Sequence, residues 1–156
     1  MRVMLNRHEQ LICEVMGTVR RKNAMQFNSD HQVSKQNPYD MDIDGFTGEF
    51  AVAKHLNVMV DTTINEKKNP IDLIWNQKTI DVKSSRNPNV DMHVTEFHKK
   101  SPCDLYIQVV LHEGYADLIG WIDGKTLFEK ATLKQHSVRS SYVLPQEELY
   151  AMEDFK

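Results

Sequence analysis

Two short segments rich in β-branched and aromatic residues lie close together in the chain and constrain its fold more than any other feature. They occupy residues 71–75 (Ile-Asp-Leu-Ile-Trp) and 79–83 (Thr-Ile-Asp-Val-Lys), and the three polar residues 76–78 separate them. Runs of this composition joined by a polar turn are typical of an antiparallel hairpin. The sequence therefore predicts a sheet in which these segments are neighbouring strands.

Side-chain alternation along the second strand separates its polar residues from its apolar ones. Asp81 and Lys83 are two residues apart and so share one face, whereas Ile80 and Val82 point the other way, into a core. Antiparallel pairing brings Asp72, at the start of the first strand, opposite the region of Asp81. We expect two carboxylates and a lysine to form a polar site on a rigid frame.

The rest of the chain predicts a mixed α/β (α+β) fold, with a central mixed β-sheet flanked by helices. Apolar residues at helical spacing predict helices over 7–25 and 44–56, the second capped by Asp44. The other expected elements are an irregular connection over 26–42, strands over 58–64, 105–111 and 115–122, a turn over 112–114, and short helices within 91–100 and over 125–132 and 145–152.

The length and composition are those of one soluble domain. The chain has 156 residues, of which 40% are hydrophobic and 26% charged. We expect a single domain with an N-terminal helical extension (about 1–40), a core (about 44–122) and a C-terminal helical segment (about 123–156). No apolar run approaches the ~20 residues that cross a bilayer, so no membrane association is expected.

The two cysteines indicate the cellular compartment of the protein. Cys13 and Cys103 lie far apart, which favours two reduced thiols over a disulfide framework or a zinc site, and no secretory signal is evident. We expect a cytoplasmic protein.

The net charge of −3 does not exclude DNA as a partner, because affinity depends on local phosphate contacts, but it argues against nonspecific coating of DNA.

The residue types of the hairpin suit hydrolysis of phosphodiester bonds. Carboxylate oxygens are the ligands that Mg²⁺ prefers, and the ion usually keeps several waters. It can orient a phosphate and lower the pKa of a bound water. We expect Lys83 to act by positioning that water and by stabilising negative charge in the transition state.

This pattern resembles the PD-(D/E)xK nuclease superfamily. Pro70-Ile71-Asp72 is followed, nine residues after Asp72, by Asp81-Val82-Lys83, and Glu49 lies on the helix before them. The resemblance covers residues 44–122. It implies a restriction-endonuclease-like core, with Asp72, Asp81 and Glu49 as ligands of Mg²⁺ (Mn²⁺ as a substitute) and Lys83 as the catalytic lysine. Ile71, which separates Pro70 from Asp72, departs from the simplest form of the motif.

Further polar residues are candidates for substrate binding. Gln108 interrupts an apolar strand, and it either serves the site or faces solvent. Ser84, Ser85 and Arg86 follow the catalytic strand and either contact phosphates or form an ordinary polar loop. His93, His98, Lys99 and Lys100 form either a positive rim or a solvated helix face.

Three functions compete at this level. We favour a metal-dependent nuclease that hydrolyses DNA, and an endonuclease rather than an exonuclease. The N-terminal helix is the candidate interface of a homodimer. The alternatives are a catalytically inactive nucleic-acid-binding or protein-binding module on the same fold and an interaction protein whose acidic surface mimics DNA. The complete acidic set favours the enzyme.

Overall fold

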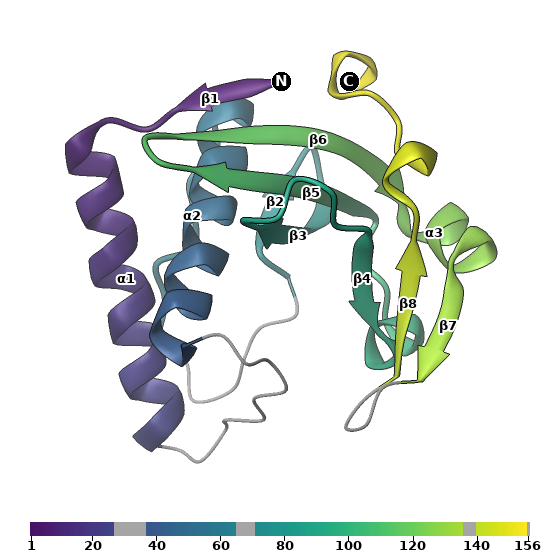
Figure 1. Ribbon diagram of the computed structural model, residues 1–156, viewed down its shortest axis with the longest axis horizontal. Helices are drawn as coiled ribbons and strands as arrows, with labels where there is room; N and C mark the ends of the chain where they lie inside the picture. The colour runs from purple at the N-terminus through teal and green to yellow at the C-terminus, as the bar shows by residue number, and fades with distance from the viewer. Residues whose placement is uncertain (27–36, 65–70, 136–139, 156) are drawn as a thin grey trace.

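A curled five-stranded mixed sheet forms the centre of the protein (Figure 1). The computed structural model describes residues 1–26, 37–64, 71–135 and 140–155. Across the sheet, the strands run in the order β1 (Arg2–Met4), β6 (Tyr115–Asp123), β5 (Leu105–His112), β3 (Lys78–Ser85) and β2 (Leu73–Trp75). The β3–β5 pair is parallel and the other pairs are antiparallel, so the sheet is mixed.

Helices and a second, smaller sheet surround the central sheet (Figure 1). Helix α1 packs against α2, and α2 packs against the central sheet. The smaller sheet is antiparallel, in the order β4, β8, β7. The elements are α1 (Arg7–Gln26), α2 (Pro38–Leu56), β4 (Met92–Thr95), η1 (Glu96–Lys100), α3 (Gly124–Lys130), β7 (Thr132–Gln135), β8 (Ser140–Leu144), η2 (Gln146–Glu148) and η3 (Met152–Asp154).

Two apolar clusters lie on opposite faces of β3 and β5. The face with Ile80 and Val82 joins the cluster that includes Ala51 and Val52 of α2. Tyr106, which pairs with Asp81 in the parallel register, belongs to the second cluster, with residues of β4, β8 and α3. The sequence prediction that Ile80 and Val82 point into a core is confirmed, and Asp81 and Lys83 lie on the other face.

The predicted hairpin is present, with a tighter turn than expected. Trp75 pairs with Lys78, so the turn consists of Asn76 and Gln77 rather than of three residues. Both turn residues have positive φ angles, 48° and 65°, as the two central residues of a type I′ turn require. The predicted strands over 105–111 and 115–122 and the helix over 7–25 are also confirmed, each within a residue or so at either end.

Two predictions around the second helix are wrong. The helix begins at Pro38, not at Asp44, because Asn37 caps it by accepting a hydrogen bond from the Tyr39 N–H, and Pro38 suits the first helical position. The connection expected over 26–42 is therefore helical from residue 38, and its residues 27–36 lie outside the described part. No strand forms over 58–64, since Asn57 (φ 54°) turns the chain at the helix end.

The C-terminal part contains strands that the sequence did not predict. Strands β7 and β8 follow α3, which matches the helix expected near 125–132. The helix expected over 145–152 is absent: η2 and η3 flank Tyr150, whose backbone pairs with that of Trp121. The short helix expected within 91–100 is η1, and β4 precedes it.

Close packing of α1 on α2 depends on Gly17. A Cβ atom added there would overlap the backbone of Ile43 in α2, with the Ile43 nitrogen only 2.6 Å away. Helices approach this closely only where one of them lacks a side chain. Gly45 of α2 provides a contrast, because an added Cβ would meet no atom within 4 Å.

We predict that Gly17→Ala destabilises the protein by about 1–3 kcal/mol, the usual cost of overpacking a closed interface. Denaturant unfolding measures the change. The control Gly45→Ala should stabilise by about 0.5–1 kcal/mol, because alanine is the better helix former. Equal stability of the two variants would contradict the close contact between α1 and α2.

Candidate active site

The β2–β3 hairpin brings Asp72 and Asp81 together. Leu73 pairs with Ile80, and the Asp72 N–H donates to the Ile80 carbonyl, so the register places Asp72 opposite Asp81. The Val82 N–H donates to Asp72 Oδ2 at 2.7 Å and fixes this carboxyl group at the end of the hairpin. Asp81 lies in the middle of β3, between β2 and β5, with only 2% of its surface exposed.

The environment of Asp72 opposes its ionisation. Burial, followed by the negative charges of Glu49 and Asp81, raises the pKa of Asp72 to about 7. Three carboxyl groups, from α2, from β3 and from the residue just before β2, therefore lie close enough to repel one another. A group poised near neutral pH in such surroundings is a frequent mark of a functional site.

Asp81, in contrast, is held ionised by two basic side chains. Lys83 Nζ lies 2.7 Å from Asp81 Oδ1, and His98 Nδ1 of η1 lies 3.0 Å from Asp81 Oδ2. Burial raises the pKa of Asp81, but Lys83 and His98 together outweigh burial and lower it. Apart from this contact with His98, Asp81 Oδ2 has no hydrogen-bond partner among the described residues.

His98 is the site residue that the sequence did not single out. It was expected in a positive rim or on a solvated helix face, but it turns inward to Asp81. The contact spans 17 positions of the chain and depends on the return path through β4 and η1. No local pattern of the sequence indicates it.

Glu49 reaches the same region from α2 and is held by an arginine from α1. Arg20 Nη1 lies 2.8 Å from both carboxylate oxygens of Glu49, and Arg20 Nη2 donates to the Asp61 carbonyl. The guanidinium also lies over the ring of Phe46. A metal ion at Glu49 would therefore compete with Arg20 for the carboxylate.

Gln108 extends the polar face next to Lys83. The two residues are partners in the parallel β3–β5 register, and paired residues point to the same face. Gln108 is 1% exposed, which rules out the solvent-facing alternative. Its Nε2 donates to the Val90 carbonyl at 2.5 Å, whereas its buried Oε1 has no hydrogen-bond partner among the described residues.

Ser84 and Ser85 are the last two residues of β3, not part of a loop, and both they and Arg86 make contacts within the protein. Ser84 Oγ donates to the Asp44 carbonyl, and Ser85 Oγ accepts from the Asn87 N–H. Arg86 binds the buried carboxylate of Asp44 through Nε and Nη2, at 2.6–3.0 Å, and its side chain remains 61% exposed. A phosphate contact by Arg86 would have to share the guanidinium with Asp44.

The donor chemistry of this cluster fits a divalent cation. Asp72 and Asp81 offer carboxylate oxygens, and a cation bound to them would relieve the repulsion that raises the pKa of Asp72. Within the described residues, the buried Asp81 Oδ2 contacts His98 Nδ1 at 3.0 Å without an aligned hydrogen bond. No preformed cluster of three or more metal-ligating side chains is found in the described ranges. A cation would therefore rely on the two aspartates and water, and on Glu49 only after release from Arg20.

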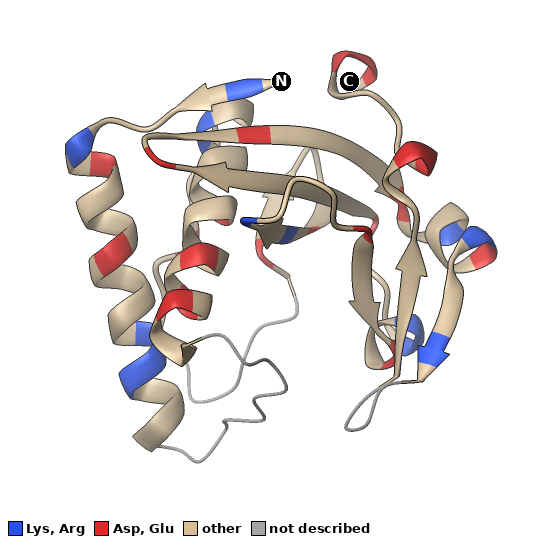
Figure 2. Cartoon of the chain, in the orientation of Figure 1, with Lys and Arg blue, Asp and Glu red and all other residues tan. Residues whose placement is uncertain are grey.

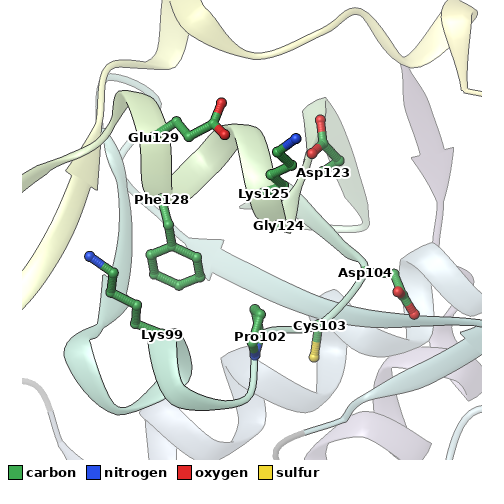
Figure 3. A pocket seen from close by; sticks show the side chains of 9 residues that line it. All are labelled: Lys99, Pro102, Cys103, Asp104, Asp123, Gly124, Lys125, Phe128 and Glu129. Atoms are coloured by element: carbon green, nitrogen blue, oxygen red, sulfur yellow. The ribbon is translucent and has the colours of Figure 1, made fainter.

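An open depression is formed by residues other than those of the cluster (Figure 3). Its volume is about 640 Å³, and it is lined by Lys99, Pro102, Cys103, Asp104, Asp123, Gly124, Lys125, Phe128 and Glu129. Asp104 accepts hydrogen bonds from Thr79, and Asp123 accepts one from the Thr126 N–H. None of the predicted catalytic residues lines this depression.

We predict that Asp72→Asn stabilises the metal-free protein at pH 8. The folded-state pKa of about 7 lies above the ordinary value of 3.8, so the stabilising effect of the protonated carboxyl is full below pH 3.8 and is lost as the pH rises to about 7. The increase in the free energy of unfolding caused by Asp72→Asn should therefore grow between pH 3.8 and about pH 7 and stay constant at higher pH. Denaturant unfolding in EDTA at several pH values measures it.

Asp104→Asn is a control of opposite sign. Hydrogen bonds from the Thr79 backbone and side chain lower the pKa of Asp104, so its removal should cost stability above its ordinary pKa of 3.8. A loss of stability at pH 8 in Asp72→Asn would show that Asp72 is not under electrostatic repulsion.

Two further findings concern the chain as a whole. No described helix has the length and apolar character needed to cross a membrane. Comparisons with known protein families, with curated proteins and with solved structures find no match.

Proposed function

We propose that the protein is a metal-dependent nuclease that hydrolyses phosphodiester bonds of DNA, built on a restriction-endonuclease-like core. The observation that carries this proposal is the pairing of the half-buried Asp72 with the buried Asp81, with Lys83 at 2.7 Å from Asp81. The arrangement of carboxyl groups with a raised and a lowered pKa beside a lysine is suited to hydrolysis at a phosphate.

Each residue has a distinct part in this proposal. Asp72 and Asp81 hold Mg²⁺ or Mn²⁺, with Glu49 as a further ligand when Arg20 releases it. The ion supplies charge neutralisation and an acidified water when it is bound. Lys83 orients the attacking water and stabilises negative charge on the phosphate oxygens, since it leaves the same strand face as Asp81.

Neighbouring groups support these residues. Gln108 lies beside Lys83 in the parallel register, and its buried Oε1, which has no partner among the described residues, can accept a hydrogen bond from water at the site. Ser84, Ser85 and Arg86 lie where the strand leaves the site and contact the DNA backbone in this proposal. The competing proposal of an inactive binding module predicts retained DNA binding without cleavage.

We predict that Asp81→Asn and Lys83→Ala each lower cleavage at least about a hundredfold while the proteins stay folded. The assay uses linear, circular, single-stranded and branched DNA with Mg²⁺ or Mn²⁺, and circular dichroism checks folding. Calorimetric titration should show that Asp81→Asn also loses metal binding. Cleavage stops when EDTA removes the metal.

Lys78→Ala is the matched control for the lysine. Lys78 lies on the same strand, is exposed, and should be dispensable for cleavage. Normal cleavage by Asp81→Asn or by Lys83→Ala would exclude this site as the catalytic centre. Metal-independent DNA binding without cleavage of any substrate would favour the inactive module.

We also propose that α1 mediates homodimerisation. Leu11, Ile12 and Val15 are 49%, 47% and 53% exposed and lie within two turns of this helix, away from buried Cys13 and Gly17. An apolar stripe of this kind is suited to a second copy of the same helix. Such a dimer would carry two copies of the carboxylate site.

We predict that Val15→Asp shifts a dimer to the monomer in sedimentation velocity, because an ionised carboxylate in an apolar interface is costly. The control is Glu14→Asp, which lies on the same exposed part of α1 and keeps its charge. A wild-type protein that stays monomeric at every tested concentration would refute dimerisation through α1.

A further inference from the structure

The short helix η1 lies against the carboxylate site and presents an aromatic side chain to solvent. His98 of η1 lies 3.0 Å from Asp81 Oδ2, which ties the helix to the centre of β3. Phe97 directly precedes His98, yet it is 63% exposed. The proposed chemistry gives this phenylalanine no part.

A single exposed apolar side chain is ordinary on a protein surface, so its neighbours decide its meaning. A 3₁₀-helix has three residues per turn, which places Phe97 and Lys100 on the same side of η1. Lys99 and Lys100 are both exposed, and Glu96 is the one acidic residue of the helix. An aromatic face and an excess of positive charge therefore occur together beside the site.

The basic character continues from η1 onto the smaller sheet. Figure 2 shows basic segments on η1 and on β7 at the same end of this sheet, where β7 carries Lys134. Lys99 Nζ lies 5.0 Å from the ring centroid of Tyr142 in β8, so the helix is also held against the sheet. This surface complements a phosphate backbone that leaves the carboxylate site.

We propose that η1 binds an unpaired nucleotide of the DNA substrate, with Phe97 stacked on its base and Lys99 and Lys100 near the adjoining phosphates. This inference rests on the proposed function, because the DNA strand bound at η1 is the one that continues to Asp81 and Lys83 for cleavage. Bases inside an intact duplex are stacked on one another and leave no face for a side chain. The substrate class is therefore DNA with unpaired nucleotides, such as a single strand, a flap or a fork.

The test measures DNA binding in EDTA, where no cleavage occurs. Fluorescence anisotropy compares a labelled single strand, a forked duplex and a blunt duplex. The wild type should prefer the first two, and Phe97→Ala should weaken single-strand binding about tenfold, as expected for one stacked base. Phe97→Trp should keep the affinity, and a fluorescent base analogue should be quenched by the wild type and by Phe97→Trp but not by Phe97→Ala.

Met4→Ala is the matched control, because Met4 has the same 63% exposure and lies on β1, at the other edge of the central sheet from β2. The affinity of Met4→Ala for single-stranded DNA should equal that of the wild type. Unchanged affinity in Phe97→Ala, or equal affinity of the wild type for a blunt duplex, overturns the assignment of η1.

The binding and cleavage assays separate this inference from the nuclease proposal. Metal-dependent cleavage of a blunt duplex that Phe97→Ala leaves intact overturns the role of η1 and supports the nuclease. Stacking through Phe97 without cleavage of any DNA supports the role of η1 and overturns the nuclease. If the wild type binds none of the oligonucleotides, the proposed role of η1 is overturned. This conclusion holds even if η1 is then found to bind a protein.

Discussion

A buried carboxylate in the middle of the central sheet is the constraint on which the site depends. Asp81 is 2% exposed, and an ionised group at such a position costs several kcal/mol unless opposite charges compensate it. Lys83 compensates one oxygen from the same strand, and His98 approaches the other from η1. The position of η1, and with it that of Phe97, is therefore coupled to the charge of Asp81.

Asp72 and Asp81 respond to the same burial in opposite ways. Asp81 has two basic neighbours and a lowered pKa, whereas Asp72 faces the charges of Glu49 and Asp81 and has a pKa of about 7. The two pKa values therefore shift in opposite directions because the neighbouring charges differ in sign. A cation that binds both groups would favour the ionised form of Asp72 and release its proton.

The sequence predicted the parts of the fold that depend on local patterns. Alternation along residues 79–83 correctly placed Ile80 and Val82 in the core, and the apolar strands β5 and β6 were equally clear. Strand β7 was missed because all four of its residues are exposed, so no apolar alternation marks it. The start of α2 was missed because Asn37-Pro38 indicates a turn as readily as a helix cap.

The site itself shows the same division. The hairpin could be predicted to join Asp72, Asp81 and Lys83, but the contacts of His98 and Arg20 join distant parts of the chain. Arg20 in particular makes α1, taken from the sequence as an extension outside the core, a part of the site through Glu49. Because Glu49 is 7% exposed, loss of Arg20 would remove an ion pair from a nearly buried carboxylate and so destabilise the protein. The first helix therefore supplies the arginine with which a metal ion at Glu49 would have to compete, so α1 belongs to the site and is not an extension outside it.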